Sequence, residues 1–149
     1  MKYTCEIEID LPREKMVALF DNPDNMKFWM PGFVSMTPLT GTPGREGVQS
    51  LLKFKMGKRD IEMIESITKR NLPEEFNGTY ETKGVFNIQN NRFVSLGPSK
   101  TKWISESECR FSGYMKIFGF LMPGAFKKQS YKYLVHFKEF AEQGKKVNE

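Results

Sequence analysis

Hydrophobic and polar residues alternate along several stretches of the chain, which is the pattern of strands that bury one face. In the first stretch, Tyr3, Cys5, Ile7 and Ile9 alternate with polar residues. Similar patterns predict further strands over residues 33–39, 48–56, 59–69, 76–83, 84–96 and 101–113. In residues 84–96 the apolar positions do not share one parity, so the pattern leaves open which side of that strand faces inward.

Helical spacing appears in two parts of the chain. After the first strand, Met16, Val17 and Phe20 predict a short helix, and the segment around Trp29 predicts a second one. After Gly113 the apolar period changes to 3.6, which predicts a long C-terminal helix. Its apolar stripe contains Phe126, Ser130, Tyr133, Leu134, Phe137, Phe140 and Ala141. The order of elements predicts one α+β domain over residues 1–149, in which a curved antiparallel sheet of six to seven strands wraps around the long helix.

Five segments in this order resemble a known superfamily. They are IEIDLPREKMVALFDNPDN, FWMPGF, GTPGREG, KTKWISE and YLVHFKEFAE. The chain resembles the helix-grip fold of the SRPBCC superfamily, which contains plant pollen allergens, START lipid-transfer domains, and polyketide cyclases and dehydratases. It is most similar to small bacterial members described as polyketide cyclase-like. The resemblance implies a cavity between the sheet and the long helix that binds sterols, lipids or polyketides, but it supplies no universal catalytic motif.

Composition and charge argue against several classes of function. The chain has 149 residues, 39% of them hydrophobic and 28% charged, as is typical of a soluble globular protein. No apolar run is long enough to span a bilayer and the start does not resemble a secretory signal, so we expect a cytoplasmic protein. A net charge of +5 without a dense basic stripe argues against nucleic-acid binding. With two cysteines, one histidine and no phosphate-binding loop or dinucleotide fingerprint, we expect neither a metal nor a cofactor.

The last predicted strand, residues 101–113, has an unusual inward row. Trp103 and Phe111 are large, but Ser105, Ser107 and Cys109 between them are small. Because protein interiors are closely packed, the missing volume requires an explanation. In one interpretation, aromatic residues of the long helix (Phe126, Tyr133 and Phe137) fill it. In the other, it is a ligand cavity in which the serine hydroxyls orient the ligand.

Two further residue types stand out in the predicted interior. Glu65 shares the inward row of its strand with Ile61, Met63 and Ile67. It is either a polar anchor or an acid/base in the cavity, or it is turned outward by a bulge or paired with a neighbouring Lys, Arg or Tyr. Cys5 and Cys109 both have inward parity on strands expected to be neighbours, and we expect two reduced thiols rather than a redox link. The candidate ligand-binding residues are Trp29, Phe54, Met63, Glu65, Tyr80, Trp103, Ser105, Ser107, Phe126, Tyr133 and Phe137.

Three functions follow from these residues. The first is a carrier or sensor that binds a small lipid-, sterol- or polyketide-like molecule without catalysis. The alternative is a cyclase or dehydratase that acts by shape and one acid/base, with Glu65, Tyr80 or Tyr133 as candidates. The third is an interaction module in which the apolar segment GYMKIFGFLMPGA contacts a membrane or a partner. We favour instead that this segment folds over the cavity mouth. Both a monomer and a homodimer are compatible with the sequence.

Overall fold

Seven antiparallel strands form one sheet, and its two edges are the first and second strands of the chain. The computed structural model describes residues 1–148. The sheet has the order β1-β7-β6-β5-β4-β3-β2. Its strands are β1 (Lys2–Ile9), β2 (Phe33–Thr40), β3 (Gln49–Met56), β4 (Arg59–Asn71), β5 (Glu75–Thr82), β6 (Val85–Gly97) and β7 (Lys100–Phe111). From β2 to β7 the strands form a meander, and β7 then pairs with β1, as the sequence predicted.

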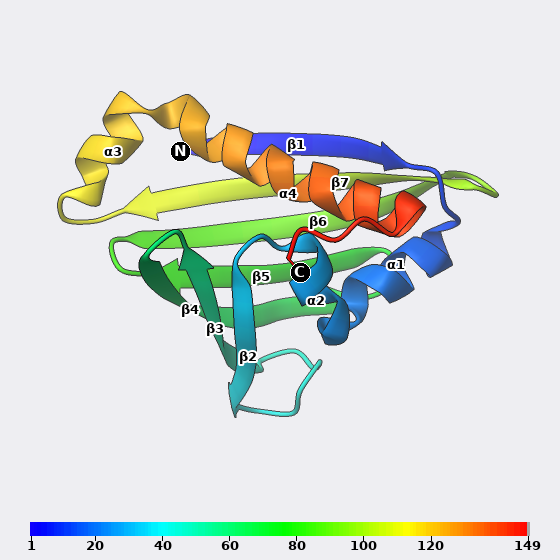
Figure 1. Ribbon diagram of the computed structural model, residues 1–149, viewed down its shortest axis with the longest axis horizontal. Helices are drawn as coiled ribbons and strands as arrows, with labels where there is room; N and C mark the ends of the chain where they lie inside the picture. Colours follow the sequence, from blue (N-terminus) through cyan, green and yellow to red (C-terminus); the bar gives the residue numbers. More distant parts are fainter. Residues whose placement is uncertain (149) are drawn as a thin grey trace.

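The helices lie at both ends of the chain. Between β1 and β2 come α1 (Arg13–Asp21), a 3-10 turn (Pro23–Asn25) and α2 (Met26–Trp29). After β7 come α3 (Met115–Leu121) and the long helix α4 (Pro123–Gln143). Figure 1 shows α4 running along the β1 side of the sheet, with α1 and α2 beneath its C-terminal half. The predicted helix-grip α+β fold is therefore confirmed.

Side-chain contacts place α4 alongside β1, with the two elements running in the same direction. The Tyr3 hydroxyl lies 2.7 Å from Ser130 Oγ near the start of both elements. Near their ends, the backbone N–H of Asp10 donates to the Glu142 carboxylate at 2.7 Å. Since α4 packs mainly along the edge strand, space remains between the helices and the middle of the sheet.

The apolar interior consists of two clusters. The larger cluster joins α1, α2 and α4 to the sheet through aromatic rings, and Phe137 contacts both Trp29 and Trp103, with ring centroids 5.2 and 5.4 Å apart. The smaller cluster joins α2 to β3 and contains Met26, Leu52 and Phe54. The helical stripe predicted for α4 supplies Leu134 and Phe137, the two buried residues of α4.

The facing of β6, which the sequence left open, follows from its pairing with β7. Asn91 lies opposite Ser105, and Phe93 lies opposite Trp103, so the odd-numbered residues of β6 share the inward side. Three of the inward residues that line the cavity are polar: Asn87, Gln89 and Asn91. These polar residues interrupt the inward row, and the apolar residues Phe86 and Ile88 lie in the outward row. The sequence of β6 therefore shows no clear apolar alternation.

In the apolar segment after Gly113, residues Met115–Leu121 form α3, and the chain breaks at Met122 before α4 begins at Pro123. This segment does not fold over the cavity, which corrects the interpretation favoured above: none of its residues lines the cavity, and most of its large apolar side chains are exposed. No helix within residues 1–148 has the length and apolar character needed to span a bilayer.

Candidate functional site

A cavity of about 560 Å³ lies between the concave face of the sheet and the helices. Its walls come from both apolar clusters. Strands β3 to β7 supply residues such as Leu52, Met63, Tyr80 and Trp103, while α1, α2 and α4 supply Phe20, Met26, Trp29, Tyr133 and Leu134. A volume of this size is within the range of small-molecule sites in proteins.

Eight of the eleven candidate residues line this cavity. They are Trp29, Phe54, Met63, Glu65, Tyr80, Trp103, Ser105 and Tyr133. The other three candidates, Ser107, Phe126 and Phe137, lie outside its lining. Phe126 packs on Phe111 instead, with ring centroids 5.0 Å apart, and Phe137 is completely buried within the aromatic cluster.

The small row of β7 is open at one position and closed at another, and the residue that closes it is Tyr3 of β1 rather than the helix aromatics Phe126, Tyr133 and Phe137. Ser105 lines the cavity. Ser107 lies opposite Tyr3 of β1, whose hydroxyl contacts Ser130 of α4, so α4 and β1 close this part of the interior. Burial raises the pKa of Tyr3 to about 12, which keeps the hydroxyl protonated at physiological pH. The missing volume is therefore packed at Ser107 and open at Ser105.

Glu65 is the most unusual residue of the cavity, because its carboxyl group is buried in a mostly apolar wall. It lies in regular register with Ser50 of β3 and Tyr80 of β5. The bulge of β4 begins only after Ile67, so the interpretation in which a bulge turns Glu65 outward is wrong. Among the alternatives left open by the sequence, the structure selects an inward carboxyl beside a tyrosine.

Burial has a strong effect on the protonation of this pair. It raises the pKa of Glu65, and the neighbouring Tyr80 hydroxyl lowers it by a smaller amount. The pKa of Tyr80 is raised well above its ordinary value, first by burial and then by the negative charge of Glu65. The pair can thus offer a ligand one protonated hydroxyl and one carboxyl group that accepts a proton more readily than an exposed glutamate.

The other polar side chains of the cavity differ in whether they already form a hydrogen bond within the protein. Asn91 accepts a hydrogen bond from Trp103 Nε1 at 2.9 Å and donates to the Phe76 carbonyl at 3.1 Å, so it organises the wall. By contrast, the side chains of Ser50, Gln89 and Ser105 line the cavity without a hydrogen-bond partner among residues 1–148. These three groups are available to a ligand.

An ion pair at the cavity lining connects α1 to β4. The Arg70 guanidinium donates to both carboxylate oxygens of Asp21, at 2.6 and 2.7 Å. These hydrogen bonds raise the pKa of Arg70. The backbone N–H of Arg70 also donates to the Glu46 carboxylate at 2.9 Å, which holds the loop between β2 and β3. Sequence reasoning missed this arrangement because the partners are far apart in the chain and share no local pattern.

The described part of the chain offers little for a metal ion. Within residues 1–148, no group of three or more His, Cys, Asp or Glu side chains is positioned to hold one.

Trp29 Nε1 is buried and has no hydrogen-bond partner in the same range.

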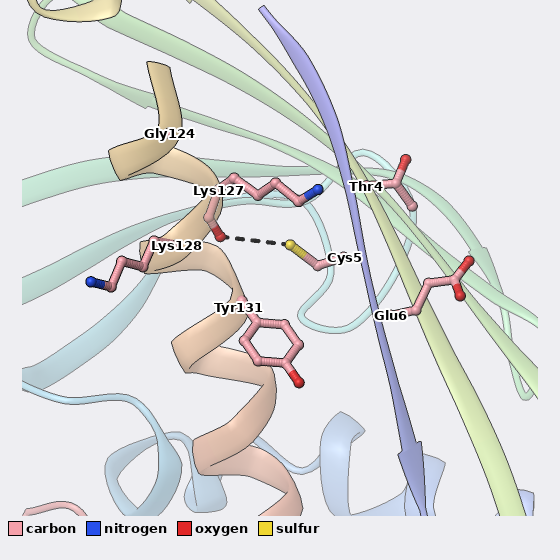
Figure 2. Close-up of a pocket in the computed structure, with 7 residues that line it drawn as sticks. All are labelled: Thr4, Cys5, Glu6, Gly124, Lys127, Lys128 and Tyr131. Atoms are coloured by element: carbon pink, nitrogen blue, oxygen red, sulfur yellow. Dashed lines mark hydrogen bonds between the residues drawn. The ribbon is translucent and has the colours of Figure 1, made fainter. Parts of the chain in front are cut away.

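Both cysteines are buried free thiols, as expected. Cys5 lies opposite Ser105, whereas Cys109 is four residues further along β7, about 13 Å away at the rise of a strand. The Cys5 thiol points towards α4 and donates to the Lys127 carbonyl at 3.7 Å, and burial raises its pKa. Figure 2 shows this thiol in a second, more open groove between β1 and α4, which is also lined by Thr4, Glu6, Gly124, Lys127, Lys128 and Tyr131.

Comparison with solved structures shows the same fold in distant proteins. The Zhui aromatase/cyclase from Streptomyces sp. R1128 aligns with a TM-score of 0.77 at 9% identity, covering 96% of this chain and 94% of that one. A truncated norcoclaurine synthase from Thalictrum flavum aligns with a TM-score of 0.73 at 12% identity, covering 96% and 94%. A conserved protein from Geobacillus kaustophilus aligns with a TM-score of 0.77 at 13% identity, covering 97% of each chain. No protein-family model matches the sequence, and no curated protein matches it.

Proposed function

We propose that this protein binds one small, mainly apolar molecule in the cavity between the sheet and α4, and that it acts as a carrier or sensor without catalysis. The observation that carries the proposal is the cavity itself, about 560 Å³ with a mainly aromatic and aliphatic lining. A lipid-, sterol- or polyketide-like molecule is the class of ligand that such a lining suits.

The driving force would be burial of apolar ligand surface, which contributes roughly 25 cal/mol per Å². The flexible thioethers of Met26, Met30, Met36 and Met63 line one part of the cavity and can adapt to ligand shape. Orientation would come from the few polar groups. A hydroxyl or carbonyl group of the ligand would meet the Glu65–Tyr80 pair, and Ser105 and Gln89 would offer further hydrogen bonds.

The structural neighbours support a ligand-binding role for this fold. Norcoclaurine synthase from Thalictrum flavum has been solved in complex with dopamine and hydroxybenzaldehyde, and it aligns with this chain with a TM-score of 0.64 at 17% identity. Those ligands belong to that protein. They support the proposal because this chain has a cavity in the same fold.

The test is native mass spectrometry of the protein purified from its own host, followed by identification of any released molecule. We expect one bound molecule per chain. Ser105→Leu should expel it, because the leucine occupies cavity volume. Ser66→Leu is the matched control: it makes the same change on the same sheet, at a residue outside the cavity lining. An empty wild-type protein, or equal retention of the ligand in both variants, would contradict the proposal.

The second candidate function is acid/base catalysis in the same cavity. The observation that favours it is the buried Glu65 carboxyl beside the Tyr80 hydroxyl, because a raised carboxyl pKa suits a group that exchanges protons near neutral pH. Glu65→Gln would then abolish turnover of the identified ligand while binding persists. The control is Glu62→Gln, an exposed position on the same strand that pairs with Lys53. Unchanged ligand after incubation with wild-type protein would count against an enzyme.

A further inference from the structure

The helix α3 and the turn after it form an apolar surface at one end of the molecule. Six large apolar side chains here are exposed by between 50% and 85%: Tyr114, Ile117, Phe118, Phe120, Leu121 and Met122. Figure 1 shows α3 beyond the end of β7, at the start of α4. Contiguous exposed apolar surface of this kind marks an interaction site. We call these six residues the α3 patch.

The other face of α3 holds the helix against the sheet, so the exposure of the patch is fixed by packing. A Cβ atom on Gly119 would lie 2.6 Å from the Phe111 ring, which shows how closely α3 approaches β7. Met115, one turn earlier, packs over Gly84. At 100° per residue, Met115 and Gly119 share one side of the helix, while Ile117, Phe120 and Leu121 lie on the opposite side.

The segment that carries the α3 patch and continues into α4 contains only positive charges. Residues 112–138 contain five lysines (Lys116, Lys127, Lys128, Lys132 and Lys138) and no Asp or Glu. Within residues 1–148, the first four of these lysines form no salt bridge. Figure 2 shows that Lys127 and Lys128 leave the same turn of α4 in different directions, so positive charge extends to both sides of the helix.

We propose that the α3 patch docks this protein on an anionic lipid bilayer. The apolar side chains would enter the interface between headgroups and acyl chains, and the lysines would contact the negative headgroups. Exposed aromatic and aliphatic side chains on one side, flanked by lysines, are the signature of such interfacial elements. A second copy of the chain fits less well, because stacking two patches would bring two sets of lysines together with no acidic residue of this segment to neutralise them.

The docking surface adjoins one end of the cavity. The backbone N–H of Ser112, just before α3, donates to the Gly84 carbonyl at 2.9 Å. Val85, which follows Gly84 in the chain, lines the cavity. If the cavity binds an apolar molecule as proposed above, docking would place this end of it at the bilayer surface. The docking itself does not depend on a bound ligand, so it can fail or succeed independently of the proposed function.

The test is flotation of the purified protein with vesicles of phosphatidylcholine alone and with vesicles that contain 40% phosphatidylglycerol. We expect flotation with the anionic vesicles only, and less of it as salt increases. Phe120→Asp combined with Leu121→Asp should reduce binding at least tenfold, because these two side chains are the most exposed of the patch. Lys127→Gln with Lys128→Gln should weaken it about 25-fold, at about fivefold per lysine.

Matched controls separate the patch from general effects of charge. Leu39→Asp with Leu96→Asp introduces the same charge at exposed apolar positions elsewhere, and Lys55→Gln with Lys58→Gln removes the same charge from the β3–β4 hairpin. We expect both controls to float like the wild type. Absence of flotation of the wild type, or equal loss in patch and control variants, would overturn the proposal. A dimer interface at the patch would overturn it as well. In that case sedimentation would show a wild-type dimer, Phe120→Asp with Leu121→Asp would dissociate the dimer, and no variant would change flotation.

Discussion

Glu65 and Tyr80 lie directly opposite each other on β4 and β5, and both side chains line the cavity. The pair places a carboxyl group and a phenol in an otherwise mainly apolar enclosure. A leucine and a phenylalanine could fill the same space without burying a polar group. Under the function proposed above, this pair would contact the ligand, and burial of the charged carboxyl has a cost in stability that can be measured.

That cost predicts a pH-dependent effect of Glu65→Gln on stability. Burial raises the pKa of Glu65 in the folded state, so the folded protein holds this proton more tightly than the unfolded chain. The stabilisation is complete below the unfolded pKa and is lost as pH rises through the folded pKa, by roughly 1.4 kcal/mol for each unit between the two. Glu65→Gln should therefore be more stable than the wild type at pH 8, and this advantage should shrink towards pH 4.

Urea unfolding at several pH values measures this difference. Glu62→Gln serves as the control, because its side chain is exposed on the same strand and should give a nearly constant small difference. A stability difference for Glu65→Gln that does not vary with pH would show that the carboxyl titrates like an exposed one.

The aromatic cluster predicts a large contrast between two phenylalanines. Phe137 is completely buried and contacts Phe20, Trp29, Trp103 and Phe140. Its replacement by alanine removes these contacts and leaves a void, which costs about 3–5 kcal/mol. Phe120→Ala removes the same atoms from a side chain that is 85% exposed, and should change the free energy of unfolding by less than about 0.5 kcal/mol. Chemical denaturation of both variants checks the contrast, and similar losses would mean that α3 packs against another part of the molecule in solution.

The Asp21–Arg70 ion pair predicts a measurable coupling. Both side chains are about one-third exposed, which weakens their interaction, but the bidentate geometry strengthens it. A double-mutant cycle with Asp21→Asn and Arg70→Gln should give a coupling of about 1 kcal/mol that decreases at 1 M salt. The Lys53–Glu62 pair, at 3.8 Å and more exposed, is the comparison and should couple more weakly. Equal coupling in the two pairs would show that the bidentate contact is not kept in solution.

The sequence predicted the fold well because the signals for it are local. Alternation identified the strands, and the apolar stripe of residues 126–141 identified the long helix. The cavity was harder to predict from the sequence. The small row of β7 indicated it, but the packing of Ser107 under Tyr3 depends on how β1 and α4 meet, which no local pattern encodes.

The inward polar residues of β6 show the same limit. Asn87, Gln89 and Asn91 resemble a solvent-facing row in the sequence, and they are inside because β6 pairs in register with the inward row of β7. Asn91 is buried because it can satisfy Trp103 and Phe76 at once. Such compensation is visible only after distant residues have been brought together.

The two cysteines predict slow thiol chemistry. Cys5 and Cys109 are only 3% and 4% exposed, and burial raises the pKa of the Cys5 thiol, so little thiolate is present to react. In the native protein at pH 8, both should react with Ellman's reagent at least about 100-fold more slowly than in 8 M urea, because reaction requires local opening. The two thiols are about equally buried, but only Cys5 lines the groove between β1 and α4, so local separation of α4 should expose it first; Cys5→Ser should then remove the faster phase and Cys109→Ser should leave it. A rapid native reaction at Cys109 would contradict the packing of β7 against β1, while a rapid one at Cys5 would show that α4 separates readily from the edge strand.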